Sequence, residues 1–137
     1  MEGDTALSHL WKSLMQVEQC FEREMLPQPQ GPKSFVEECM TARKTAYLSF
    51  KTAENNAHRS IRAAEPFLSR EVVALAESAV YTAAKEFNSL INLSRRVMAL
   101  PDREKARRVM LSKRRRSLEL FRRHVRSLRQ GIPETIE

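Results

Sequence analysis

The chain has 137 residues, a formal net charge of +7 at pH 7 and 30% charged residues. A chain of this length folds by default as one domain, and we expect a single helical domain over residues 1–137. The charged content, and the lack of a run of about 20 apolar residues, exclude a membrane span. The first residues, MEGDTALSH, lack the basic and apolar segments of a signal peptide, so we expect a cytoplasmic protein.

Composition predicts the fold class. Ala, Leu, Glu, Lys, Arg and Met dominate, and only 3 Gly are present. These common residues favour helices, whereas alternating polar and apolar runs and Asn-Gly or Asp-Gly turns are missing. The sequence therefore predicts an all-α protein. Its four helices are expected over residues 5–26, 35–64, 70–100 and 102–130.

The first predicted helix begins at Asp4 or Thr5, either of which can cap it. Its apolar residues recur every three or four positions, as in a coiled coil: Leu7, Leu10, Leu14, Val17, Phe21 and Met25. Pro27 ends this helix, and three prolines and a glycine make residues 27–33 (PQPQGPK) a loop.

Capping signals place the other helices. Ser34 begins the second helix with the capping box S-F-V-E. A turn containing Pro66 follows, and Ser69 caps the third helix. Pro101 and Asp102 separate the third helix from the fourth. Gly131 provides a stop after the fourth helix, which leaves residues 131–137 as a loose tail.

Three of the predicted helices have matching lengths of about 30 residues, or about 45 Å. Matching lengths, short connections and one apolar stripe per helix predict an up-down-up-down four-helix bundle of long antiparallel helices. The alternative is a pair of long hairpins that complete their cores only as a dimer.

The fourth helix carries most of the charge. Between Arg95 and Arg129 the sequence has 14 Lys or Arg and 3 Asp or Glu residues. At about 100° per residue, one face of this helix is apolar. That face holds Ala106, Val109, Met110, Leu111, Leu118, Leu120, Phe121, Val125 and Leu128. The candidate anion-binding residues on the opposite side are Arg108, Arg115, Arg116, Arg122, Arg123, Arg126 and Arg129.

A row of guanidinium groups repels itself, so its presence needs a reason. One reason is a solvated face, neutralised in part by carboxylates of neighbouring helices, for which the candidates are Glu18, Glu22, Glu77 and Glu86. Others are a phosphate-bearing partner, an acidic protein or a membrane surface. The excess of 17 Arg over 7 Lys favours phosphate, because the Arg fork matches phosphate oxygens.

We therefore expect a non-enzymatic binding module whose Arg-rich helix engages an anionic partner, RNA or DNA, through backbone phosphates. Long helices do not match a compact helix-turn-helix unit, so phosphate contact without base reading is the expected mode. The alternative is an interaction or structural module that binds an acidic protein or forms a homodimer.

Three polar residues, Lys113, Ser117 and His124, interrupt the apolar face of the fourth helix along nearly one line. We expect a bundle edge at which each polar group finds a partner, since long polar side chains reach the solvent from such positions. The alternative is a polar pocket inside the bundle, which an enzyme would need.

Other chemistry has little support in the sequence. The three histidines fall on different predicted helices and lack the Glu-x-x-His spacing of di-iron bundles. We expect Cys20 and Cys39 to be free thiols, without a zinc site, another metal or a cofactor. Phosphate-binding loops, nucleophile elbows and dinucleotide fingerprints are missing, so we expect no enzymatic activity.

Overall fold

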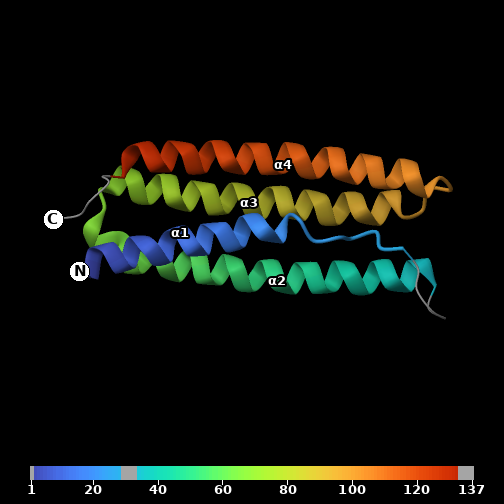
Figure 1. The fold of residues 1–137 in the computed structure, drawn as a ribbon, viewed down its shortest axis with the longest axis horizontal. Coiled ribbons are helices and arrows are strands. Elements are labelled where there is room, and N and C mark those ends of the chain that lie inside the picture. Colours follow the sequence, from blue (N-terminus) through green and yellow to red (C-terminus); the bar gives the residue numbers. More distant parts are fainter. Residues whose placement is uncertain (1, 29–33, 133–137) are drawn as a thin grey trace.

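The computed structural model describes residues 2–28 and 34–132, which form helices packed side by side (Figure 1). The helices are α1 (Glu2–Cys20), α2 (Phe35–Ala64), the short 3-10 helix η1 (Glu65–Phe67), α3 (Arg70–Val97) and α4 (Arg103–Gly131). Consecutive long helices run in opposite directions, and the described residues contain no β-strand. The predicted all-α class and four-helix bundle are confirmed.

Side-chain caps set the starts of α2, α3 and α4. The Ser34 hydroxyl accepts a hydrogen bond from the backbone N–H of Glu37 at 3.1 Å, and Ser69 caps α3 in the same way. The Asp102 carboxylate accepts from the N–H of Lys105 at 3.0 Å. Each cap pairs a backbone donor that a helix start leaves unsatisfied, so the predicted starts hold to within one residue.

The first helix is shorter than predicted. α1 begins at Glu2 and ends at Cys20, so the expected helix over residues 5–26 is wrong at both ends. Phe21 and Met25 are buried, as the apolar spacing requires, but their backbone is not helical. We name residues 21–28 the strap, and Figure 1 shows it continuing along the bundle beyond the end of α1.

The strap lies along the part of the bundle that α1 does not reach (Figure 1). α1 has 19 residues and α2 has 30, which leaves roughly 16 Å of α2 without α1 beside it. Extended chain advances about 3.3 Å per residue, twice as far as a helix, and covers that distance with fewer residues. Buried Met25 and Leu26 then occupy the place of the missing helical turns.

Side chains satisfy four of the backbone polar groups of the strap. The Glu24 carboxylate accepts hydrogen bonds from the N–H groups of Met25 at 3.0 Å and Leu26 at 2.9 Å. From α4, Arg107 donates to the Leu26 carbonyl at 3.4 Å, and Arg114 donates to another strap carbonyl at 3.3 Å. These bonds add to the turn bonds that the N–H groups of residues 21–23 donate to carbonyls of the last three residues of α1.

Four phenylalanines meet in the core where α1 gives way to the strap. The Phe50 and Phe87 rings stack with centroids 4.4 Å apart. Phe21 presents an edge to Phe87 at 5.6 Å and lies 6.3 Å from Phe121. All four side chains are at most 2% exposed. Each comes from a different segment of the chain, so the cluster joins the strap to α2, α3 and α4.

Smaller differences from the sequence prediction occur at other helix ends. α3 stops at Val97, three residues early, and α4 includes Gly131 rather than stopping before it. A Cβ atom at Gly131 would lie 3.1 Å from Cγ2 of Val72, so a larger residue there would require the Val72 side chain to shift. The predicted loop residues 29–33 and tail residues 133–137 lie outside the described residues.

The sequence predicts that no segment spans a membrane, and the described helices test this prediction. None of the described helices combines the length and the apolar character that crossing a bilayer requires. The sequence-based exclusion of a membrane-spanning helix therefore holds for the described residues.

Candidate anion-binding ridge on the Arg-rich helix

The buried face of α4 is narrower than its sequence predicts. Its buried residues are Ala106, Met110, Ser117, Leu118, Phe121 and Leu128. Leu111 and Leu120, predicted on the same face, are 40% and 36% exposed. These two leucines are nine residues apart, which places them about half a turn apart around the helix, at opposite edges of the apolar face. More of the α4 circumference therefore faces solvent than expected.

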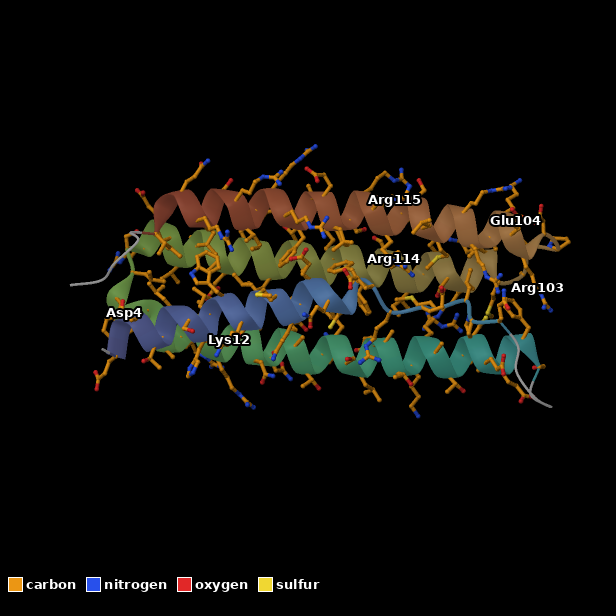
Figure 2. All side chains as sticks on the ribbon, in the orientation of Figure 1. Asp4, Lys12, Arg103, Glu104, Arg114 and Arg115 are labelled. Carbon is orange, nitrogen blue, oxygen red and sulfur yellow. The ribbon has the colours of Figure 1, made fainter. Side chains whose placement is uncertain are left out.

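Seven cations form a solvent-exposed row on this wide outer surface, and we name the row the ridge. It consists of Lys105, Arg108, Arg115, Arg116, Arg122, Arg123 and Arg126. Figure 2 shows Arg115 on the side of α4 turned away from the other helices, and Arg114, which is not a ridge residue, on the inward side. Six of the seven predicted anion-binding arginines thus share one exposed surface.

The protein's own carboxylates form ion pairs with part of the ridge. Arg122 pairs with Glu18 of α1 at 2.7 Å, and Arg108 pairs with Glu104 one turn away at 3.5 Å. Glu119 is shared by Arg123 at 3.5 Å and Arg126 at 3.0 Å. Three carboxylates therefore serve four arginines, all of them between 46% and 67% exposed.

Three ridge residues stand apart from this pairing. Among the described residues, no ion pair or hydrogen bond to another side chain is recorded for the side chains of Lys105, Arg115 and Arg116, and the last two are exposed neighbours at the middle of α4. The hydrogen bond from Arg126, together with the charge of that guanidinium, lowers the pKa of the Glu119 carboxyl. Glu119 therefore stays ionised at neutral pH, yet the ridge as a whole keeps an excess of positive charge.

A second set of α4 arginines, which we name the flank, contacts α1, the strap and the start of α2. Besides Arg107 and Arg114 on the strap carbonyls, Arg103 lies over the Phe35 ring at 4.2 Å. Arg129 lies over the indole of Trp11 at 5.1 Å. Arg129 was predicted with the anion-binding residues, but the structure places it in this set, where cation–π contact and packing engage it.

The three polar residues that interrupt the apolar face of α4 have hydrogen-bond partners on α3. The Glu86 carboxylate accepts from Lys113 Nζ and from Ser117 Oγ, both at 3.0 Å. His124 Nε2 and Thr82 Oγ1 lie 3.2 Å apart. The expected bundle edge with satisfied polar groups is therefore found, and Lys113 and His124 do not share a partner.

Opposing effects act on the pKa of the Glu86 carboxyl. Burial alone raises the pKa of its carboxyl, but the hydrogen bonds from Lys113 and Ser117 and the Lys113 charge outweigh burial, so the pKa is lowered. Of the four carboxylates predicted to neutralise the basic helix, Glu18 and Glu86 do so. No ion pair of Glu22 or Glu77 is recorded among the described residues.

The two cysteines are free thiols, as the sequence predicted. Cys20 and Cys39 are free and buried, and burial raises the pKa of both thiols. Within residues 2–28 and 34–132, no group of three or more His, Cys, Asp or Glu side chains is close enough to hold a metal ion.

The chain was compared with protein-family models, with curated proteins and with solved structures, and no match was found in any of the three. Function is therefore inferred from the geometry of the chain's own residues. The ridge differs from an ordinary mixed-charge surface of a small domain, because its seven cations outnumber the three carboxylates that pair with them.

Proposed function

We propose that the protein is a non-enzymatic binding module whose ridge engages the phosphate backbone of a nucleic acid. The observation that carries the proposal is the division of the α4 arginines. The flank arginines have intramolecular partners that explain their presence, whereas Arg115 and Arg116 face solvent with no recorded carboxylate partner in the described chain. Both guanidinium groups are therefore available to an external anion, and their planar donors match the oxygens of a phosphate.

The length of the ridge suits a polymeric anion. From Arg108 to Arg126 the helix advances 18 residues, or about 27 Å. Duplex DNA rises about 3.4 Å per base pair, so the ridge spans roughly eight base pairs. Guanidinium groups bind phosphate oxygens in pairs and carry no base preference in that role. The proposed contact therefore reads the charge and spacing of the backbone and not the base sequence.

The ion pairs of the ridge are weak enough for a phosphate to take the place of a carboxylate. Exposed ion pairs contribute at most about 1 kcal/mol to stability, and the pairs of Arg108, Arg123 and Arg126 are more than half exposed on the arginine side. A phosphate can therefore replace Glu104 or Glu119 at little cost. Those carboxylates lower the affinity of the ridge without abolishing it.

The test is fluorescence anisotropy with a labelled DNA duplex longer than this footprint, and with the single strand, at rising salt. If about four phosphates are neutralised, affinity falls by about 100-fold between about 50 and about 200 mM salt. The double variant Arg115→Glu/Arg116→Glu should lose most of the binding. The control Arg59→Glu/Arg62→Glu changes two exposed arginines of α2, carries the same net charge and should retain it.

Two results would overturn the proposal. One is affinity that does not change with salt, since phosphate contacts release counterions. The other is equal loss of binding in the α2 control, which would show that net charge and not the ridge is responsible. A discrete oligomer that is not retained on a polyanion resin would instead support the alternative function, an interaction module.

A further inference from the structure

A cavity of about 620 Å³ lies between α2 and α3. The two helices line it with residues at the same i, i+3, i+4, i+7 spacing, which places each set on one helix face. Met40, Arg43, Lys44 and Tyr47 come from α2, and Ile91 and Arg95 come from α3. None of the lining residues belongs to α4, so the cavity, which we name the groove, is separate from the ridge.

The groove gathers positive charge that the described residues do not compensate. Its lining contains three cations, Arg43, Lys44 and Arg95, and no carboxylate. No ion pair of any of the three is recorded in the described part of the chain. Bringing guanidinium groups together in a partly enclosed space is unfavourable unless an anion joins them.

Arg43 shows this most clearly. Its side chain is half-buried, and its Nη1 atom has only neutral partners, Ser94 Oγ at 3.4 Å and Met98 Sδ at 3.6 Å. Burial, followed by the nearby charge of Arg95, lowers the pKa of the Arg43 guanidinium. Within the described residues, Arg43 thus has these two neutral partners and no recorded carboxylate partner.

The walls beside these cations combine exposed apolar side chains of α2 with Asn88 and Asn92 of α3. Met40 is 55% exposed and Tyr47 is 40% exposed, although both are large side chains that contribute surface to the groove. Ile91 forms the facing wall from α3. A ligand body that covered Met40 and Tyr47 would remove apolar area from water, which stabilises binding by about 25 cal/mol per Å².

We propose that the groove binds a small organic anion, with its carboxylate, sulfonate or phosphate head on Arg43 and Arg95 and a flat apolar body against Met40 and Tyr47. A cavity of about 620 Å³ falls within the range of small-molecule sites. Charge and apolar surface are both required in this proposal. It does not depend on the ridge, because the two sites share no residue.

The experiment tests the need for charge and for apolar surface with three probes. The binding of each probe is measured from amide NMR spectra of the full chain. Naphthalenesulfonate carries both head and body, naphthol carries the body alone, and sulfate carries the head alone. We expect naphthalenesulfonate to shift the amide signals around Ile91 and Tyr47 and to bind at least about tenfold more tightly than either part, a difference of about 1.4 kcal/mol.

Variants then assign the contacts. Arg95→Gln changes an exposed residue and should weaken naphthalenesulfonate binding by about tenfold, and Arg43→Gln should do the same if it folds. Arg62→Gln, which removes one exposed charge from α2 outside the groove, should leave the affinity unchanged. Because Arg95 is exposed, its variant tests the proposal even if the Arg43 variant is unstable.

Four results would overturn the proposal. The first three are equal affinity for naphthol or sulfate, signal shifts at other residues, and unchanged affinity in Arg95→Gln. The fourth is a shift of the same amides with rising protein concentration alone. That result would assign the groove to a second copy of the chain.

Discussion

Arg122 of α4 donates from Nε to Oε1 of Glu18 on α1 at 2.7 Å, across 104 positions of sequence. The two side chains are 46% and 31% exposed, so the bond lies at the edge between the ridge and the first helix. Glu18 therefore has two roles. It attaches α1 to α4, and it occupies a guanidinium that an external phosphate would otherwise bind.

The first prediction separates these roles. Glu18→Gln should increase the affinity of the ridge for a DNA duplex severalfold, because it frees Arg122 and raises the local positive charge. The free energy of unfolding should change by less than about 1 kcal/mol, as expected for an exposed ion pair. Anisotropy and urea denaturation measure the two effects.

The control for this prediction is Glu22→Gln. Glu22 is exposed, and the described structure records no ion pair for it, so its replacement changes the net charge equally without releasing an arginine. If both variants raise the affinity to the same extent, the effect comes from net charge and the role assigned to Glu18 is wrong.

The second prediction contrasts the flank with the ridge. Arg107→Ala/Arg114→Ala removes two donors to strap carbonyls, so amide hydrogen exchange in residues 21–28 should accelerate and stability should fall by about 1–3 kcal/mol. Arg115→Ala/Arg116→Ala should leave the exchange unchanged while weakening DNA binding. The division into two sets fails if both double variants affect the strap alike.

The third prediction concerns pH and Glu86. Its carboxyl pKa is lower in the folded protein than its ordinary value of 4.5. The stability it contributes is therefore present above about pH 4.5 and is lost as pH falls through the lowered folded-state pKa. Glu86→Gln should cost about 1–2 kcal/mol at neutral pH, because Lys113 and Ser117 lose a charged acceptor.

Urea unfolding at neutral and acidic pH checks this prediction. The difference between the native protein and the Glu86 variant should shrink as the pH is lowered. Glu77→Gln serves as the control, since Glu77 is exposed and has no ion pair recorded in the described chain. A difference that stays constant with pH would show that Glu86 does not titrate as proposed.

The fourth prediction tests the aromatic cluster. Phe21→Ala should reduce the free energy of unfolding by about 3–5 kcal/mol, because Phe21 is 1% exposed and contacts the three other phenylalanines. Tyr81→Ala should cost less than about 0.5 kcal/mol, since Tyr81 is 70% exposed. Thermal unfolding followed by circular dichroism gives both values. Similar losses would mean that the strap is not anchored through Phe21.

Local signals predicted most of the fold correctly. Capping residues act within three positions of the helix start, so Ser34, Ser69 and Asp102 predict the starts of α2, α3 and α4. The end of α1 was missed because apolar spacing reports which side chains are buried, not whether the backbone between them is helical. Phe21 and Met25 are buried in the strap as they would be in a helix.

The polar partners could not be predicted to the same degree. Glu86 lies 27 positions from Lys113 in sequence, and only the packing of α3 against α4 brings their charged groups to 3.0 Å. The sequence offered four carboxylates as candidates and had no means to choose Glu18 and Glu86 among them. Pairing across helices depends on register and rotation, which local periodicity does not define.

The amino-acid pattern alone determined that this chain is helical, where three of its long helices begin, and that its charge is concentrated in the last one. Periodicity and capping depend on neighbours one or two turns away, so they can be read directly from the chain. Tertiary packing decided which arginines of α4 contact the strap and Trp11 and which extend from the outer surface of the bundle. All of these arginines have the same charge, and only the positions of the other segments distinguish them.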